Sequence, residues 1–175
     1  DTVYPKMFDF TYLNQDSTTI TNKDFANKVW IADFFFTSCP TICPTMTTQM
    51  KRVAKATEDL SNDLQLLSFS IDPKRDTPSR LTSYRKKYNI TQSNWAFLTG
   101  DEAKTHKLGI EHFQLFAGQD ENSAGGYAHS PAFTLVDKEG YVRGVYVGTE
   151  TKDVDRLIED VRKLLKIEYG ISGSK

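Results

Sequence analysis

The sequence lacks several features that would assign a protein to a class at sight. Its 175 residues include two cysteines, no signal peptide and no apolar run of about 18 residues, the length that indicates a membrane-spanning helix. Two cysteines are too few for a disulfide-rich scaffold. Lysine and arginine number 22 against 23 acidic residues, so the formal net charge is −1 and the basic surface typical of nucleic-acid binding is missing. We therefore expect no nucleic-acid partner.

The chain also lacks internal repeats and any linker rich in glycine, proline or serine. Its hydrophobic content of 38% suffices for a core without metal or disulfide support. We expect one domain over residues 1–175, with a frayed tail at residues 170–175. The two cysteines are then available for function.

Both cysteines lie in the segment FFFTSCPTICPTM, where an apolar run gives way to a helical pattern. The run at residues 29–36 is rich in aromatic and β-branched residues, which predicts a strand buried on both faces of a sheet. Pro44 suits the first position of the helix that follows, so Cys43 is expected at or beside its N-cap. The positive end of a helix dipole favours a thiolate, which predicts a lowered pKa for Cys43.

Three uses of the cysteine pair have to be compared: structural thiols, a structural disulfide, and a reactive or metal-binding pair. Buried structural cysteines usually occupy core positions, whereas Cys39 and Cys43 flank prolines in a strand-to-helix loop. A disulfide that closes so short a loop would constrain the unfolded chain very little. The pattern favours a reactive or metal-binding pair.

The rest of the chain alternates between strands and helices. Asp72 and Asp76 follow the second buried strand and could be catalytic, but turn formation and capping of the helix that begins at Pro78 explain them more simply. His106 and His112 lie on a predicted helix and are given no role. The further elements predicted are strands at residues 64–71 and 95–99, helices at residues 101–113 and 154–165, and hairpins at residues 8–21 and 132–147.

This order resembles the thioredoxin fold, an α/β architecture with a mixed sheet flanked by helices, here with an N-terminal β-hairpin and an insertion before the last hairpin. The insertion, residues 114–127, is expected to be a flexible loop. In the thioredoxin fold a proline just ahead of the last hairpin faces the cysteine loop, and Pro131 holds that place here. The resemblance therefore predicts a cis bond before Pro131 and brings His129 close to Cys39 and Cys43.

Three segments in order, FTSCPTICP, SIDPKRDTP and YAHS ahead of the turn DKEG, closely resemble the Sco/SenC family over about residues 8–165. Its members are thioredoxin-like copper proteins that serve assembly of the dinuclear copper site of cytochrome c oxidase. The resemblance implies that this chain binds copper, as Cu(I) or Cu(II). It implies Cys39, Cys43 and His129 as the ligands, and Asp72 as a residue near the cysteine loop.

The same resemblance implies partners and a location. The expected recipient is the copper-site subunit of cytochrome c oxidase, and another copper chaperone or a thiol reductant would act upstream. Family members are tethered to membranes and face outside the cytoplasm. We therefore expect an extracytoplasmic, periplasmic-side protein whose membrane tether would lie in a segment ahead of the chain given.

The donor chemistry agrees with these implications. Soft thiolates select Cu(I), and two sulfurs with one imidazole suit three-coordinate Cu(I), which can accept a further ligand during transfer. An added oxygen ligand would complete a tetragonal Cu(II) site. Structural zinc normally takes four protein ligands, and neither a third cysteine nor a second nearby histidine is evident. The alternative for His129 is a plain loop histidine.

Two residues beside the histidine depart from the family pattern. Relatives commonly have Asp where this chain has Ala128, so a carboxylate that orients the imidazole must come from elsewhere. Relatives usually lack proline at the position of Pro131, which makes this chain more similar to thioredoxins beside the site. That similarity argues against very tight copper binding.

The residues leave two further functions open. A thiol-disulfide oxidoreductase would use Cys39 as the attacking thiol and Cys43 as the resolving one, and would reduce cysteines of the oxidase copper site. The three residues between the cysteines, in place of the thioredoxin two, and the presence of His129 favour metal binding instead. A peroxiredoxin-like peroxidase needs Thr and Pro at fixed positions before its cysteine, where Cys43 has Pro40 and Phe36. We rank it last and a copper metallochaperone first.

Overall fold

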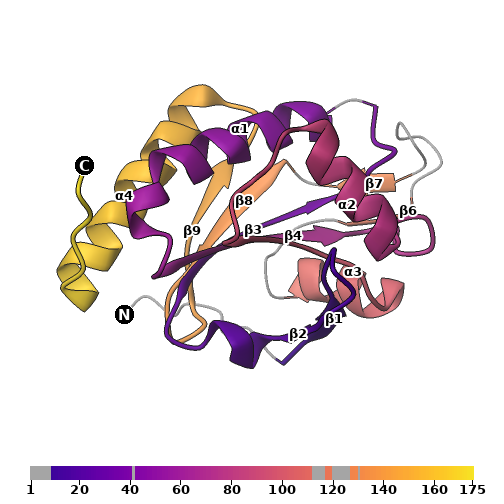
Figure 1. Ribbon diagram of the computed structural model, residues 1–175, viewed down its shortest axis with the longest axis horizontal. Helices are drawn as coiled ribbons and strands as arrows, with labels where there is room; N and C mark the ends of the chain where they lie inside the picture. The colour runs from indigo at the N-terminus through magenta and orange to yellow at the C-terminus, as the bar shows by residue number, and fades with distance from the viewer. Residues whose placement is uncertain (1–8, 41, 112–116, 120–126, 130) are drawn as a thin grey trace.

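The computed structural model describes residues 9–40, 42–111, 117–119, 127–129 and 131–175, with the backbone alone at residues 111, 117–119 and 127–129. A five-stranded sheet runs through its centre (Figure 1) in the order β5-β4-β3-β8-β9. Strand β4 is parallel to β3 and β5, whereas β8 is antiparallel to β3 and β9. This mixed sheet confirms the predicted thioredoxin-like architecture. Its strands are β3 (Val29–Phe35), β4 (Leu64–Ser70), β5 (Trp95–Leu98), β8 (Ala132–Val136) and β9 (Val142–Val147).

Helices cover both faces of the sheet (Figure 1). The hydroxyls of Thr47 and Tyr84, 2.7 Å apart, join α1 to α2 over one face, and those of Tyr12 and Thr105, 2.8 Å apart, join β1 to α3 over the other. No helix in the described part of the chain is long and apolar enough to span a membrane. The first face carries α1 (Ile42–Ala56), α2 (Pro78–Lys87) and α4 (Thr151–Tyr169), and the second carries α3 (Glu102–Glu111), β1 (Thr11–Leu13), β2 (Thr19–Thr21) and the short helix η1 (Asn22–Phe25).

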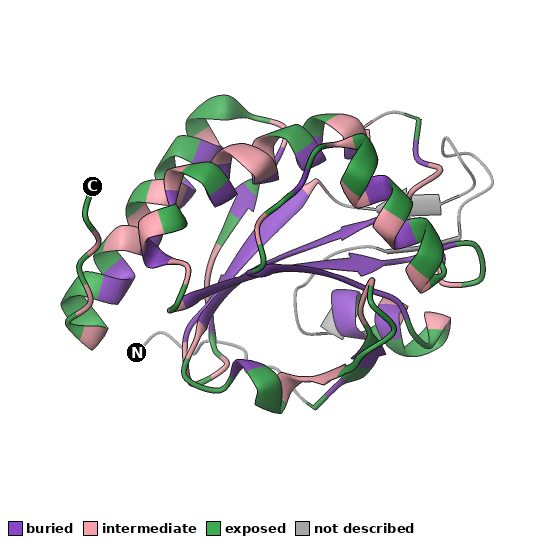
Figure 2. Cartoon of the chain, viewed as in Figure 1, coloured by how far each residue is buried: buried purple, intermediate pink, exposed green. Residues whose placement is uncertain are grey.

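Strands β3 and β4 are buried along their whole length (Figure 2), as their apolar sequences predict. Successive residues of a strand point to opposite faces, so each face needs its own packing. Phe35 packs edge-on against Phe97 on one face, and Phe34 stacks on Phe69 on the other. A doubly covered sheet of this kind holds the ends of β3 and β4 firmly, and these ends carry the candidate site.

The predicted N-terminal hairpin is present, and it covers the β5 edge of the sheet. Leu13 and Thr99 exchange two backbone hydrogen bonds of 2.9 Å each. The side chain of Gln15 accepts a further bond of 3.0 Å from the N–H of Phe97. An uncovered strand edge can pair with other chains, so the hairpin removes that hazard on this side of the sheet.

Two predicted boundaries need correction. Helix α1 begins at Ile42, two residues before Pro44, which was expected to open it. Proline is tolerated there because N–H groups in the first turn have no partner within the helix. The predicted loop at residues 114–127 contains β6 (Ala117–Gln119) and the start of β7 (Tyr127–His129), which pair antiparallel. Neither strand has an apolar alternation, so the sequence pattern did not reveal this hairpin.

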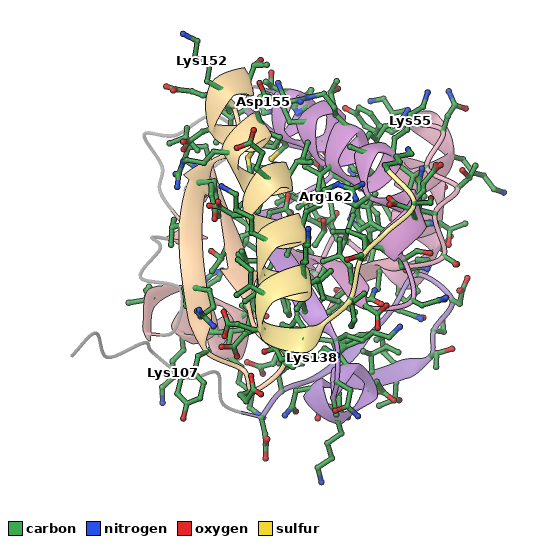
Figure 3. The ribbon with its side chains drawn as sticks, turned by 90° about the vertical axis from the view of Figure 1, so that its left-hand side faces the viewer. Lys55, Lys107, Lys138, Lys152, Asp155 and Arg162 are labelled. Atoms are coloured by element: carbon green, nitrogen blue, oxygen red, sulfur yellow. The ribbon has the colours of Figure 1, made fainter. Side chains whose placement is uncertain are left out.

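Residues 170–175, expected to fray, are held against the rest of the chain. Gly170 ends α4 with a φ of 68°, a left-handed conformation that glycine adopts without strain. The N–H of Lys175 donates a hydrogen bond of 3.1 Å to Asp59. Asp59 also binds both Nη atoms of Arg162, which Figure 3 shows on α4. The anchor was hidden from the sequence because the tail and Asp59 are 116 positions apart.

Candidate functional site

The candidate site lies at the edge of the sheet where β3 and β4 end. In sheets with parallel strands, ligands usually bind outside the carboxyl ends of the strands. The cysteine loop follows β3 at this edge (Figure 1). The N–H of Ile71, just after β4, donates a hydrogen bond of 2.9 Å to the carbonyl of Phe35. The loop that carries Asp72 therefore leaves the sheet beside the loop that carries the cysteines.

The backbone also leads His129 to this edge. Strand β8 runs antiparallel to β3 with Thr134 opposite Ala32, so that its first residue, Ala132, lies near the end of β3. His129 ends β7, shortly before Ala132. Its imidazole and the Ser130–Pro131 bond, predicted to be cis, lie outside the described residues. Both predictions stay as predictions.

Cys39 is the last residue of a tight turn that directly follows β3. Its N–H donates a hydrogen bond of 3.1 Å to the carbonyl of Phe36, which makes Thr37 and Ser38 the central residues of the turn. Cys43 follows in the first turn of α1. The cysteines are reduced and not joined by a disulfide, and they are 8% exposed for Cys39 and 1% for Cys43. The pair is enclosed, and Cys39 is its more accessible member.

The position of Cys43 near a helix N-terminus does not lower the pKa of its thiol, so that prediction was wrong. A hydrogen bond to Cys39 and burial raise the pKa of Cys43 well above its usual value, and the negative charge of Asp33 adds to them. A hydrogen bond with the backbone of Phe36 acts in the opposite direction and is outweighed. The reduced pair therefore holds its proton, which a metal ion or an oxidant has to displace.

The apolar run that predicts β3 contains one charged residue, Asp33, which lies 2% exposed in the middle of the strand. It accepts a hydrogen bond of 2.5 Å from the hydroxyl of Ser68, which itself accepts one of 3.0 Å from the indole of Trp95. Sequence reasoning passed over Asp33, although a signal was present. A carboxylate inside a buried strand needs polar partners and is rarely placed there without a use.

Asp72, which the resemblance places near the cysteine loop, lies in the loop after β4 and is 2% exposed. Its carboxylate is 3.6 Å from the guanidinium of Arg75, and its N–H donates a hydrogen bond of 3.1 Å to Ser70. Its carbonyl accepts hydrogen bonds from the N–H groups of Arg75 and Asp76, so it shapes a turn, as the sequence indicates. A role toward the cysteines stays a prediction.

Asp76 contacts the cysteine loop directly, which the sequence did not predict. Its carboxylate is fully buried and accepts hydrogen bonds from the N–H and hydroxyl of Thr37, and one of 2.7 Å from the hydroxyl of Ser70. Burial raises the pKa of Asp76 against the effect of these bonds. Spacing along the chain could not reveal the contact, because Asp76 and Thr37 are 39 positions apart.

A metal ion would need more than the donors that the described side chains bring together. Within the described part of the chain, no group of three or more His, Cys, Asp and Glu side chains could hold a metal ion. The two thiols supply two donors. Of the three predicted ligands, His129 is the one whose side chain falls outside that search, so a three-ligand site depends on its imidazole.

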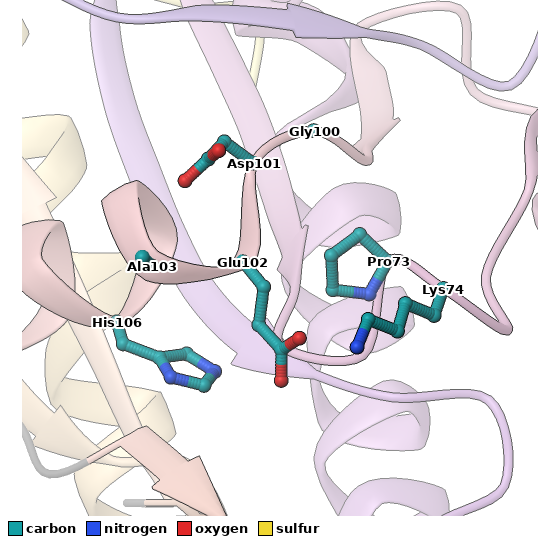
Figure 4. A pocket seen from close by; sticks show the side chains of 7 residues that line it. All are labelled: Pro73, Lys74, Gly100, Asp101, Glu102, Ala103 and His106. Carbon is teal, nitrogen blue, oxygen red and sulfur yellow. The ribbon is translucent and has the colours of Figure 1, made fainter.

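A separate hollow of about 700 Å³ opens beside the Asp72 loop (Figure 4). The ring of His106 reaches it from α3 and is tied to the end of β4, with Nε2 3.1 Å from the carbonyl of Ile71. Lys74 and Glu102 bring opposite charges to the same hollow. Acidic, basic and apolar residues line this hollow, and neither cysteine is among them, so it is a different place from the cysteine pair. Its lining is Pro73, Lys74, Gly100, Asp101, Glu102, Ala103 and His106.

The known proteins that this chain resembles include members of one family. The family model described as SCO1/SenC matches residues 3–166. The crystal structure of a SCO1/SenC family lipoprotein from Bacillus anthracis has a TM-score of 0.85 and 34% identity, covering 93% of this chain and 96% of that one. BsSco, a member of the Sco family of cytochrome c oxidase assembly proteins in which a disulfide switch was identified, has a TM-score of 0.82 and 32% identity, covering 93% and 95%. ScoI of Bradyrhizobium japonicum, solved with copper bound, is 22% identical and shares the fold, with a TM-score of 0.74 over 90% and 98% of the two chains.

Proposed function

Because this chain belongs to the SCO1/SenC family, we propose that it is a copper metallochaperone that holds copper through Cys39, Cys43 and His129. The observation that carries the proposal is the hydrogen-bonded contact between the two thiols at the edge of the sheet. The backbone of β7 and β8 leads His129 to the same edge. Two sulfurs and an imidazole suit copper, and the copper-bound structure of ScoI supports that choice of metal.

Copper uptake by this pair is a proton exchange. Cu(I) binds thiolates, so loading it onto Cys39 and Cys43 releases the protons of both thiols. The contact between the sulfurs and their burial hold the Cys43 proton in place, so uptake should strengthen as the pH rises. Cys39 is the more exposed of the two and is therefore the sulfur from which a recipient would first take the metal.

The proposed recipient is the copper-site subunit of cytochrome c oxidase. The place of BsSco among cytochrome c oxidase assembly proteins supports this destination. Another copper chaperone or a thiol reductant would prepare the pair upstream. The lipoprotein from Bacillus anthracis supports a tethered location on the outer, periplasmic side of a membrane.

A thiol-disulfide oxidoreductase acting on the cysteines of the oxidase copper site is the second candidate. The unequal exposure of the pair favours it, because an attacking thiol such as Cys39 has to be reached while a resolving thiol such as Cys43 can stay buried. The disulfide switch identified in BsSco supports the same chemistry. The two activities alternate, since copper on both sulfurs blocks exchange and a disulfide prevents copper binding.

The metal preference is tested by offering copper and zinc together to the anaerobically reduced protein. We expect close to one copper ion for each chain and little zinc, because two thiolates and one imidazole satisfy Cu(I) but leave zinc short of its fourth protein ligand. Zinc bound at the level of copper would contradict the proposal.

His129→Ala separates the two candidate functions. Changing a residue beside a ligand typically costs about 10- to 100-fold in metal affinity, so loss of a ligand should cost at least that, while disulfide formation persists. His106→Ala is the matched control, because this imidazole contacts the carbonyl of Ile71 instead. Cys39→Ser should abolish both activities. If His129→Ala kept the copper affinity of the parent while dithiol exchange slowed, the oxidoreductase would replace the metallochaperone.

A further inference from the structure

The turn that carries Cys39 is held by two side chains from the segment between β4 and the first turns of α2. Asp76 accepts a hydrogen bond of 3.1 Å from the N–H of Thr37 and a second from its hydroxyl. Arg80 donates one of 2.7 Å to that hydroxyl and one of 2.8 Å to the hydroxyl of Ser38. Both central residues of the turn are thereby bound to this segment.

A buried carboxylate is a costly means of holding a turn, because it loses its hydration unless donors replace it. Asp76 is fully buried and has such donors: the N–H and hydroxyl of Thr37, the hydroxyl of Ser70, and the guanidinium of Arg80 at 3.8 Å. Apolar contacts are non-directional, so they would stabilise the turn without selecting one of its conformations. Charged hydrogen bonds with fixed geometry select one conformation of the turn.

The partner thiol is positioned by other contacts. Cys43 belongs to α1, and one helical turn later the hydroxyl of Thr47 is 2.7 Å from that of Tyr84 on α2. Of the two sulfurs, the one on the turn is therefore the one whose position depends on Asp76 and Arg80. If the turn moved while α1 stayed in place, the distance between the sulfurs would change.

We propose that Asp76, Thr37 and Arg80 form a clamp that sets the position of Cys39 relative to Cys43, and so sets how readily the pair closes a disulfide or takes copper. The three are positioning residues that act through the turn. The copper part of this inference rests on the proposed function. The disulfide part does not, because it concerns the metal-free thiols.

The clamp acts on a defined equilibrium in the metal-free protein. Oxidised glutathione converts the two thiols to the Cys39–Cys43 disulfide and leaves as two molecules of reduced glutathione, which carry away both protons and both electrons. A disulfide requires Cβ atoms about 3.5–4.5 Å apart. Loosening the turn lowers the effective concentration of one sulfur at the other, so we expect the equilibrium constant for closure to fall about tenfold, a change of about 30 mV.

Four substitutions separate this role from a general effect on folding. Thr37→Val removes the hydroxyl between Asp76 and Arg80 but keeps the shape and the N–H, and Thr37→Ser keeps the hydroxyl. Arg80→Gln removes a guanidinium that is 46% exposed, so folding should tolerate it. Arg156→Gln is its matched control, since Arg156 is an ion-paired arginine of α4 that is 52% exposed.

The measurements are the closure equilibrium in glutathione buffers without copper, the Cu(I) affinity by competition with a chromogenic chelator, and circular dichroism as a check of folding. Thr37→Val and Arg80→Gln should lower closure and copper affinity about tenfold, while Thr37→Ser and Arg156→Gln stay within about twofold of the parent. If Thr37→Val does not fold, Arg80→Gln decides alone.

Parent values in both folded clamp variants would overturn the clamp. So would a loss in Thr37→Ser as large as that in Thr37→Val, because it would mean that the hydroxyl does not matter. A parent protein that bound no copper would overturn the proposed function and leave the glutathione measurement as a test of the clamp by itself.

Discussion

Removing one hydroxyl from the pair that joins α1 to α2 should destabilise the protein by an amount that depends on which hydroxyl is removed. Thr47 and Tyr84 are 3% and 6% exposed, and their oxygens are 2.7 Å apart. Thr47 lies one helical turn after Cys43, so the pair supports the helix that carries the buried thiol. The ring of Tyr84 also packs against Phe35 and Phe97, contacts that Tyr84→Phe leaves in place.

The magnitude follows from what each substitution leaves behind. Thr47→Val preserves shape but leaves the Tyr84 hydroxyl buried without its partner, which costs about 1–3 kcal/mol. Tyr84→Phe leaves a threonine hydroxyl that can turn to a carbonyl of its own helix, as Thr48 does toward Pro44 at 3.0 Å, so the cost is about 0.5–1.5 kcal/mol. For a domain of this size each kcal/mol lowers Tm by about 2–4 °C. The double variant should cost less than the sum, because neither hydroxyl is then left alone.

Urea denaturation of the parent, both single variants and the double variant completes the thermodynamic cycle. The slope m should stay constant, since the surface exposed on unfolding is unchanged. Thr48→Val, on the exposed side of the same helix, is the control and should change the free energy of unfolding by less than about 0.5 kcal/mol. Strict additivity, or a Thr47→Val variant as stable as the parent, would refute the reasoning.

Three further predictions concern protons and sulfur. Oxidation should join Cys39 to Cys43 within one molecule, because the chain has no other cysteine, and mass analysis should show a monomer lighter by two hydrogens; a mainly dimeric product would contradict this. The Cu(I) affinity should rise between about pH 6 and 8, because the pKa of Cys43 is raised and copper must displace its proton; a flat profile in competition titrations would count against loading on both thiols. Arg162 lowers the pKa of Asp59 to about 2, so the ionised carboxylate stabilises the fold above its unfolded pKa of about 3.9 and this stabilisation is lost as the pH falls toward 2. Urea titrations from pH 5 downward should therefore show a smaller loss of stability in Arg162→Gln than in the parent, and parallel losses would exclude the pair as the cause.

Features that depend on local spacing could be predicted from the sequence. The apolar run at residues 29–36 predicts β3, and Pro78 predicts the start of α2, where the structure shows Thr77 as the cap. Cys39 and Cys43 stand out because prolines flank them between a strand and a helix. Local patterns of this kind follow from backbone geometry, which distant residues alter little.

Features that depend on contacts between distant segments could not be predicted in this way. The bond between Asp76 and Thr37 arises only when the sheet places the ends of β3 and β4 side by side. The pKa of Cys43 is set by the sulfur of Cys39 and by burial, both tertiary effects, rather than by the helix terminus that the sequence reveals. Asp33 was visible as an anomaly in an apolar run, but its partners were not.

Because both sulfurs are enclosed, the rate at which they react depends on how often and how long the turn that carries Cys39 opens. Cys43 is almost inaccessible and Cys39 only slightly less so, so a large reagent or partner must wait until the turn opens. When reclosing outpaces reaction, the observed rate follows the small population of open molecules, and when it does not, the rate follows the opening step itself. Bulky oxidants and small ones then act at very different speeds on the same pair. A partner able to open the turn would then react with the pair faster than a bulky reagent that has to wait for the turn to open.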